Sequence, residues 1–231
     1  MSVDGSKAER DPASRDAEQG SREEPILVTK TWVYHTCSFG ARVYCSLWHR
    51  LRVEGVENIP REGGAVLAAN HQSFVDILML GGYVPRHVAF VARDTLANWA
   101  WLGYTMRQCG AMLVKRGTSD RKALRAMTQH LELGDTVAIF PEGTRTNDGR
   151  LLEFKGGALL AARMAKVPIV PVGIRGAIEA WPRGRSIPYP KKIGLRFGPP
   201  IDSSLPDAQE RLVASVQAMI GDGTYRSVPE I

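Results

Sequence analysis

Residues 65–80 read AVLAANHQSFVDILML, and this stretch decides how the rest of the chain is interpreted. The apolar run AVLAA predicts a buried strand and ILML falls within a predicted helix, with the polar segment NHQSFVD (70–76) between them. A polar side chain that is buried without a hydrogen-bond partner costs about 1–3 kcal/mol. The polar residues of this segment must therefore either cap and turn the chain or face a cleft in which they do chemistry.

Both interpretations of this segment rest on Asp76. Ser73 and Asp76 match the S-x-x-[DE] pattern of a capping box, in which Asp76 caps the backbone of Ser73. That interpretation leaves His71 unexplained. A His directly before a helix can be held in one tautomer by a carboxylate one turn into that helix, while its other nitrogen faces a substrate hydroxyl. A carboxylate has several acceptor sites, so the two roles are compatible, and these seven residues alone do not separate structure from catalysis.

The nucleophile in such a reaction would have to come from outside the chain. The nucleophile-elbow pattern G-x-S-x-G is absent from the sequence, and Ser73 stands in the wrong context for it. His71 would then activate an external nucleophile, with Asp76 orienting it.

The bulk composition is that of one globular domain preceded by a charged tail. Residues 1–24 contain no aromatic residue and carry a net charge of −3, so we expect this tail to be disordered; it lacks the layout of a signal peptide. The whole chain carries +6, which leaves +9 for residues 25–231. Such a charge fits phosphate-bearing substrates, acidic lipid surfaces or nucleic acid, although on charge alone simple solubility is the favoured explanation. The three cysteines show no disulfide or zinc spacing, which fits a reducing cytosolic setting.

One stretch, TWVYHTCSFGARVYCSLWHR (31–50), has the pattern of an amphipathic helix. Its polar residues recur at steps of three and four and form one stripe, and Arg42 at its centre argues against a helix that spans a membrane. We therefore predict that residues 25–50 form a helical segment that associates with the membrane interface. A helix packed against the rest of the domain explains this stretch equally well. The remaining residues, 51–231, form the predicted main domain.

Beyond residue 50, apolar runs alternate with helix-like stretches, which predicts a mixed, largely parallel sheet flanked by helices, an α/β fold. Expected strands are 65–69, 87–92, 111–116, 136–140, 168–174 and 192–198, and expected helices lie near 74–82, 95–107, 119–133, 155–166 and 205–220. NHQSFVD, KRG and PEGTR each follow one of these strands. Because ligands bind at the carboxyl ends of parallel strands, the three clusters are expected to converge on one site.

The segment FPEGTRTNDGR (140–150) has the features of an anion-binding turn. Gly143 and Thr144 can present backbone N–H groups, and Arg145 carries a planar fork suited to phosphate. Glu142 either holds Arg145 in place or binds a substrate hydroxyl. The alternative is a surface turn with a Glu–Arg pair of little energetic worth.

Two further cations are candidates for the same site. Arg116 lies at a strand end in VKRG (114–117), and Lys155 precedes a predicted helix in FKGGA (154–158), where the helix N-terminus favours anions. A solvated lysine is the simpler explanation for Lys155. The segment WPRGRSIPYPKK (181–192) is too rich in Pro and Gly for a regular element and is expected to be a basic surface loop.

Taken in order, these clusters resemble the motifs of the PlsC-like lysophospholipid acyltransferases, the 1-acyl-sn-glycerol-3-phosphate acyltransferases. NHQSFVD resembles the family's NHxxxxD motif, VKRG its second motif, FPEGTRT its third and VPIVPVGI (167–174) its fourth. The resemblance runs from about residue 51 to residue 200. It implies the α/β fold of a glycerol-3-phosphate acyltransferase-like single domain.

The resemblance also implies a reaction, in which an acyl thioester, acyl-CoA or acyl-acyl carrier protein, acylates the sn-2 hydroxyl of lysophosphatidic acid to give phosphatidic acid. His71 would be the general base and Asp76 would orient it. The glycerol phosphate would be bound by residues of the second and third motifs, namely Arg116, Glu142, Gly143, Thr144 and Arg145. Lys155 and Pro171 would be further contacts. No metal or cofactor is implied.

The expected partners of such an enzyme are its lipid and thioester substrates, an anionic membrane surface and, for one choice of donor, acyl carrier protein, but not nucleic acid. The expected location is the cytoplasmic face of a membrane, with peripheral or monotopic attachment. Acceptors other than lysophosphatidic acid, namely another lysophospholipid or glycerol 3-phosphate, stay open at this point. So does a non-catalytic module that binds anionic lipid.

Overall fold

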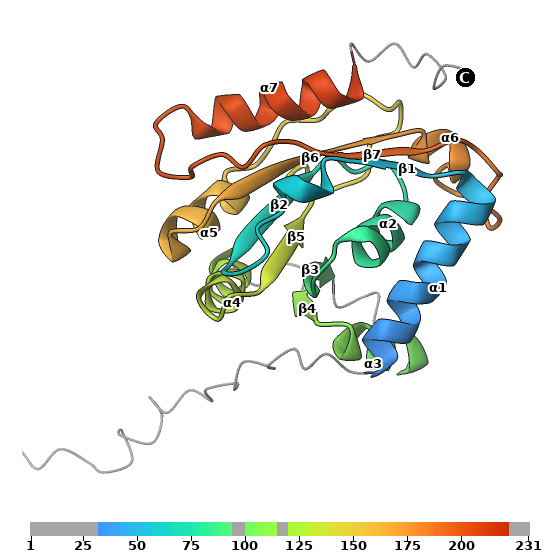
Figure 1. Ribbon diagram of the computed structural model, residues 1–231, viewed down its shortest axis with the longest axis horizontal. Coiled ribbons are helices and arrows are strands. Elements are labelled where there is room, and N and C mark those ends of the chain that lie inside the picture. Colours follow the sequence, from blue (N-terminus) through green and yellow to red (C-terminus); the bar gives the residue numbers. More distant parts are fainter. Residues whose placement is uncertain (1–31, 94–99, 115–119, 222–231) are drawn as a thin grey trace, which may run out of the picture.

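A seven-stranded sheet forms the middle layer of the computed structural model, which describes residues 32–93, 100–114 and 120–221 (Figure 1). The strand order is β1-β7-β6-β2-β5-β3-β4. Only β6 and β7 pair antiparallel among the described strands, so β1 and β7 run against the other five. The strands are β1 (Arg52–Glu54), β2 (Ala65–Ala69), β3 (Val88–Arg93), β4 (Ala111–Val114), β5 (Thr136–Ile139), β6 (Ile169–Arg175) and β7 (Gly194–Phe197).

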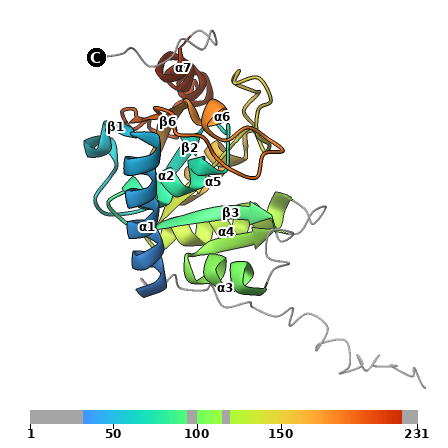
Figure 2. The same ribbon diagram turned by 90° about the vertical axis from the view of Figure 1, so that its right-hand side faces the viewer.

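Helices cover both faces of this sheet. Helices α4, α5 and α7 pack on one face, and α2 packs on the other with α1 along its outer side (Figures 1 and 2). The helical elements are α1 (Trp32–His49), the 3₁₀ turn η2 (Val56–Asn58), α2 (Val75–Tyr83), α3 (Ala100–Gln108), α4 (Asp120–Glu132), α5 (Gly157–Ala165), α6 (Ala177–Ala180) and α7 (Ala208–Ile220).

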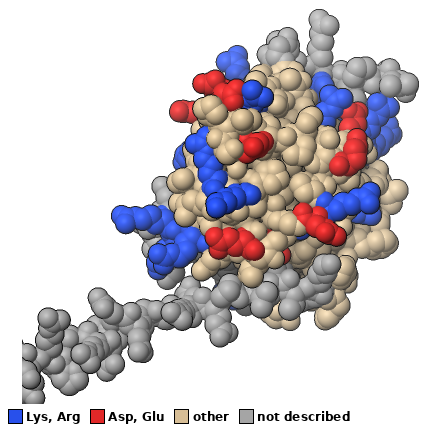
Figure 3. All heavy atoms as spheres, turned by 60° about the vertical axis from the view of Figure 1, so that its left-hand side comes forward, with Lys and Arg blue, Asp and Glu red and all other residues tan. Residues whose placement is uncertain are grey.

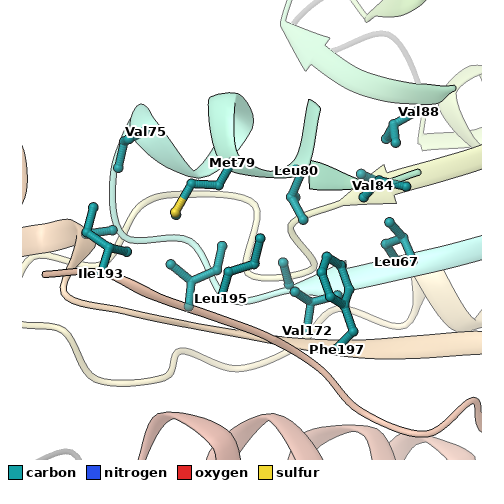
Figure 4. Close-up of a cluster of buried hydrophobic side chains, with 14 of the residues drawn as sticks. Leu67, Val75, Met79, Leu80, Val84, Val88, Val172, Ile193, Leu195 and Phe197 are labelled. Atoms are coloured by element: carbon teal, nitrogen blue, oxygen red, sulfur yellow. The ribbon is translucent and has the colours of Figure 1, made fainter. Parts of the chain in front are cut away.

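The central strand β2 separates two hydrophobic clusters. All five of its residues are buried, and because side chains alternate along a strand, Leu67 and Ala69 face α2 while Val66 and Ala68 face α4, α5 and α7. Figure 4 shows Met79 and Leu80 of α2 pointing toward the sheet, where the side chains of β2, β6 and β7 meet them. Burial on both faces explains why β2 is an unbroken apolar run.

The predicted α/β fold with a mixed, largely parallel sheet is confirmed, and each of the six expected strands is present. Strand β1 and helix α6 were not expected, because three and four residues are too few for a periodic pattern. Segment 181–192 contains no helix or strand, as predicted. The expected tail, residues 1–24, lies outside the described residues, as do residues 115 and 116 of the expected strand 111–116.

Part of the polar stripe of α1 faces α2, next to the buried Tyr34, whereas most of the large apolar side chains of α1 are exposed. The last carbonyls of a helix have no partner within it. Ser38 Oγ donates to the carbonyl of Gly81 in the last turn of α2, and Arg42 Nε donates to that of Gly82 at 2.9 Å. A Cβ at Gly82 would lie 3.1 Å from the backbone nitrogen of Arg42, so this glycine lets the two helices approach closely. The polar stripe of α1 therefore caps α2.

The outer side of α1 consequently carries exposed apolar side chains. Trp32 is 77% exposed, Phe39 70% and Leu47 79%, and Val43 and Trp48 are exposed as well. Within the described residues, no helix is both long and apolar enough to cross a bilayer.

Replacing Leu67 by Ala should destabilise the fold by about 2–5 kcal/mol, because the change leaves a cavity in a fully buried strand. Leu47→Ala removes the same atoms from an exposed position and should change the free energy of unfolding by less than about 0.5 kcal/mol. Urea denaturation of both variants measures the difference. Equal losses of unfolding free energy in the two variants would contradict the prediction that burial of β2 stabilises the fold.

Candidate active site

The site lies at the carboxyl edge of the sheet, where β2 stands between β6 and β5. These three strands are parallel, so their carboxyl ends share one edge. Helix α2, which follows β2, goes to one face, whereas α5, which follows β5, goes to the other. The connections from β2 and β5 therefore diverge, and this is the place where open α/β sheets bind ligands.

Asp76 holds the side chain of His71. The Asp76 carboxylate is fully buried, and its Oδ2 lies 2.8 Å from Nδ1 of His71. The same oxygen accepts the backbone N–H groups of Gln72 at 2.7 Å and Ser73 at 2.8 Å. A carboxylate only accepts, so Nδ1 is the donor and Nε2 carries the free lone pair. The His71 side chain is 16% exposed, and Nε2 makes no hydrogen bond to the described residues.

The capping prediction is half right. Asp76 accepts the N–H of Ser73, as a capping box requires. The reciprocal bond from the Ser73 hydroxyl is absent from the described residues, and Ser73 Oγ instead donates to the carbonyl of Trp181 at 2.9 Å. Ser73 therefore ties the start of α2 to the loop after α6.

Glu142 holds the backbone of His71, which neither sequence-based hypothesis for this residue anticipated. Its Oε1 accepts the His71 N–H at 2.8 Å and its Oε2 accepts the Leu152 N–H at 3.2 Å. The side chain is buried, and it makes no ion pair with Arg145 or any other described residue. Burial raises the pKa of Glu142 to about 7, offset in part by the two N–H donors and reinforced by the nearby charge of Asp76.

Two further contacts fix the His71 ring and backbone. The Phe140 ring stacks on the imidazole, with centroids 3.9 Å apart and planes 15° apart. The carbonyl of His71 accepts the N–H of Thr146 at 2.9 Å. The segment after β5 thus contacts His71 through a ring, an N–H and the Glu142 carboxylate.

The side chain of Asn70 joins the end of β2 to β6. Its Nδ2 donates to the carbonyl of Ile174 at 3.0 Å, and its Oδ1 accepts the Ile174 N–H at 2.7 Å. The amide thereby replaces one backbone link of the sheet at the point where β2 turns toward His71. This role of Asn70 was not predicted, although an amide directly after a buried strand is a signal for one.

The PEGTR turn brings two cations to this edge. Gly143 has a φ of +69°, and a Cβ there would lie 3.1 Å from the Lys155 ammonium, so a side chain at this position would be strained and crowded. Arg145 stacks its guanidinium 4.2 Å above the centre of the Phe74 ring and makes no ion pair within the described residues. Its fork is therefore available to an anion. Thr144 is exposed on the same turn.

Of the two remaining predicted residues, one lies outside the described residues and the other lies within the sheet. Arg116 lies outside the described residues. Pro171 is buried within β6, its carbonyl bonded to the Gly198 N–H at 2.8 Å, so it lies inside the sheet. The clusters after β2 and β5 meet as predicted, and the third cluster, residues 115–117, lies outside the described residues. Within the described residues, no group of three or more His, Cys, Asp or Glu side chains is placed to hold a metal ion.

A family model described as Acyltransferase matches residues 50–175, more than half of the chain. The chain belongs to the acyltransferase family. It is 30% identical, over 81% of its own length and 93% of the relative's, to a 1-acyl-sn-glycerol-3-phosphate acyltransferase of Bacillus subtilis. These matches confirm the family that the four motifs predicted.

A solved structure shares the fold, and further sequence relatives include an acyltransferase named for a different lipid. A crystal structure of the 1-acyl-sn-glycerophosphate acyltransferase PlsC of Thermotoga maritima superposes with a TM-score of 0.74 at 30% identity, covering 94% of this chain and 88% of that one. A lyso-ornithine lipid O-acyltransferase of Pseudomonas aeruginosa is 32% identical over 58% of this chain and 50% of its own. A chloroplastic 1-acyl-sn-glycerol-3-phosphate acyltransferase of Arabidopsis thaliana is 33% identical, but the match spans only 43% of that protein.

The buried Glu142 predicts a pH dependence of stability. Its pKa rises from the usual 4.5 to about 7 on folding, so between these pH values the unfolded chain releases a proton that the folded protein keeps. The free energy of unfolding of the wild type should therefore fall, relative to Glu142→Gln, as the pH rises from about 4.5 to about 7, and then level off. Urea denaturation of both proteins across this range measures the difference.

The exposed Glu153→Gln is the matched control and should follow the wild type at every pH. A stability difference between wild type and Glu142→Gln that does not change with pH would contradict the assignment.

Proposed function

We propose that this chain transfers a fatty acyl group from an acyl thioester to the sn-2 hydroxyl of lysophosphatidic acid, giving phosphatidic acid. The observation that carries the proposal is the bond of 2.8 Å between Nδ1 of His71 and the buried Asp76, which leaves Nε2 as an accessible base. The names of the relatives in Bacillus subtilis and Thermotoga maritima support lysophosphatidic acid as the acceptor.

The chemistry needs one base, used twice. Nε2 of His71 takes the proton of the acceptor hydroxyl while the hydroxyl oxygen bonds to the thioester carbonyl carbon. The tetrahedral intermediate then collapses, the C–S bond breaks, and the imidazolium returns its proton to the departing thiolate. Asp76 stabilises the imidazolium and keeps Nδ1 protonated throughout. Nothing in this sequence of steps requires a metal or cofactor, and acyl-CoA and acyl-acyl carrier protein present the same thioester.

The anion of the acceptor is bound on the neighbouring turn. Arg145 presents a planar guanidinium whose fork matches two phosphate oxygens. The exposed Thr144 lies on the same turn and assists, as does Lys155, whose ammonium lies beside Gly143. Glu142 positions His71 through its backbone, a role that neither sequence-based hypothesis gave it.

Two other functions are weaker candidates. The Pseudomonas aeruginosa relative is named for lyso-ornithine lipid, which carries an amino acid where lysophosphatidic acid carries a phosphate. The unpaired Arg145 favours the phosphate. Nucleic-acid binding would require basic side chains gathered along one surface. On the face in Figure 3, basic and acidic side chains are interspersed.

Replacing His71 by Ala should slow acyl transfer to lysophosphatidic acid by at least about 10²- to 10⁴-fold, because the general base is lost. The chain offers a matched control in His130. Its Nδ1 also lies 2.8 Å from an aspartate, Asp135, five residues on, but at the amino end of β5. The His130→Ala variant should keep its activity once its folding has been checked by circular dichroism. Full activity of a stably folded His71→Ala variant would refute the mechanism.

The proposed location is a membrane surface, reached through α1. The exposed residues Trp32, Phe39 and Leu47 recur at seven and eight positions and so lie on one side of the helix. An exposed apolar stripe with aromatic residues is what an interfacial helix buries between headgroups and acyl chains. The carbonyl of His49, at the end of α1, accepts the Ile193 N–H just after the loop that borders the site. Attachment through α1 therefore brings the site near the lipid acceptor, on an anionic surface that the basic chain favours.

Replacing Phe39 or Leu47 by Glu should weaken binding to vesicles of anionic phospholipid by roughly tenfold or more each, since each buried side chain of this size contributes about 1.5–3 kcal/mol. Co-sedimentation with the vesicles measures the loss. Leu133→Glu makes the same chemical change at an exposed position after α4 and serves as the control. Undiminished vesicle binding by both α1 variants would rule out this mode of attachment.

A further inference from the structure

Two arginines from different loops lie at the edge of the site. Arg145 stands on the turn after β5, and Arg183 stands in the loop after α6. Arg145 covers the Phe74 ring, whose centroid lies 5.9 Å from that of Trp181. Two residues beyond Trp181, Arg183 Nη1 donates to the Asn147 side-chain oxygen at 3.2 Å, and Asn147 lies two residues beyond Arg145. These contacts link the turn after β5 to the loop after α6 at two places. The guanidinium groups of Arg145 and Arg183 therefore border the same part of the surface.

Neither arginine has a carboxylate partner within the described residues. The pKa of Arg145 lies below its usual value, first because the side chain is partly buried and next because of the positive charge of Arg183. Asp76 offsets only part of this effect. Two neighbouring positive charges without a carboxylate partner attract an anion.

The loop that carries Arg183 is fastened to the site. Ser73 Oγ donates to the Trp181 carbonyl, and Trp181 Nε1 donates to the carbonyl of Arg185 at 2.9 Å. Ser73 is two residues from His71, so the base and the start of this loop are held by one short segment. Arg185 itself turns away and stacks 4.5 Å above the Tyr189 ring.

We propose that Arg183 is a second phosphate-binding residue, which together with Arg145 selects an acceptor with a phosphate monoester over one with a phosphodiester. The inference rests on the proposed function and adds a determinant that lies outside the four sequence motifs. A phosphate monoester carries between one and two negative charges near pH 7 and exposes three oxygens. It can therefore accept bonds from two guanidinium forks at once. A phosphodiester has one charge and fewer free oxygens, and leaves one of the two arginines unpaired.

The experiment compares kcat/KM for lysophosphatidic acid, a monoester, with that for lysophosphatidylglycerol, a diester, in three variants. Arg183→Ala should lower the value for lysophosphatidic acid roughly tenfold to a hundredfold, as expected for a hydrogen bond between charged groups. It should lower the value for lysophosphatidylglycerol far less. Arg183→Lys keeps the charge without the fork and should fall between. Arg185→Ala, in the same loop, should behave as the wild type.

Competition experiments test whether Arg183 binds the phosphate group of the acceptor. Inorganic phosphate and glycerol 3-phosphate should inhibit the wild type competitively against lysophosphatidic acid, and both should inhibit Arg183→Ala more weakly. Binding to phospholipid vesicles should not change in Arg183→Ala. If vesicle binding falls as much as transfer does, and transfer to a short-chain soluble acceptor is unchanged, Arg183 contacts the membrane and the inference is wrong.

Failure of the inference can be told apart from failure of the proposed function. If the wild type acylates lysophosphatidic acid and Arg183→Ala matches Arg185→Ala, the second phosphate-binding residue is refuted while the reaction stands. An equal loss on monoester and diester would also refute it, because a loop displaced by the substitution does not discriminate between them. If the wild type acylates none of the acceptors, the proposed function itself fails.

Discussion

A single buried oxygen atom, Oδ2 of Asp76, sets the geometry on which the site depends. A fully buried carboxylate requires donors, and here three of them converge on one oxygen: the ring of His71 and the N–H groups of Gln72 and Ser73. All three come from residues within five positions of Asp76, so the chain must turn sharply between β2 and α2. That turn caps the helix and orients the imidazole at once. The structural and catalytic interpretations of the segment describe the same three bonds.

A second buried carboxylate, that of Glu142, acts on the backbone of the same histidine. The two acids repel one another, and burial has already raised the pKa of Glu142. Burying two neighbouring acids lowers the stability of the fold, which an apolar residue in place of Glu142 would not do. The arrangement nevertheless holds His71 from the segments after both β2 and β5. A base whose ring and backbone are both held loses little entropy when substrate arrives. In the proposed mechanism, burying the two acids costs stability but holds the base in place before substrate binds.

Features that depend on residues close together in the sequence could be predicted, and features that depend on contacts between distant residues could not. Strands β2, β5 and β6 and the pair His71–Asp76 could be predicted because their signals are local: apolar runs, and two residues five positions apart. The partners of Glu142 and Ser73 could not, since their hydrogen bonds reach 71 and 108 positions along the chain. The polar stripe of α1 was visible in the sequence, but not its direction. Which side faces inward depends on the unpaired carbonyls at the end of α2, and those arise only when the two helices meet.

The separation between base and phosphate site also bears on the chemistry. In lysophosphatidic acid the glycerol carbons fix the distance from the sn-2 hydroxyl to the phosphate, so an anchored phosphate leaves the hydroxyl few positions to occupy. Phe74 connects the two ends here, since it follows His71 by three residues and supports Arg145 with its ring. Binding energy gained at the phosphate can then appear as correct placement of the hydroxyl against Nε2, and loss of that anchor should lower kcat as well as raise KM. In the proposed mechanism, an acceptor without phosphate would reach His71 with less of this guidance. The two arginines, more than His71, would then decide which lipid is acylated.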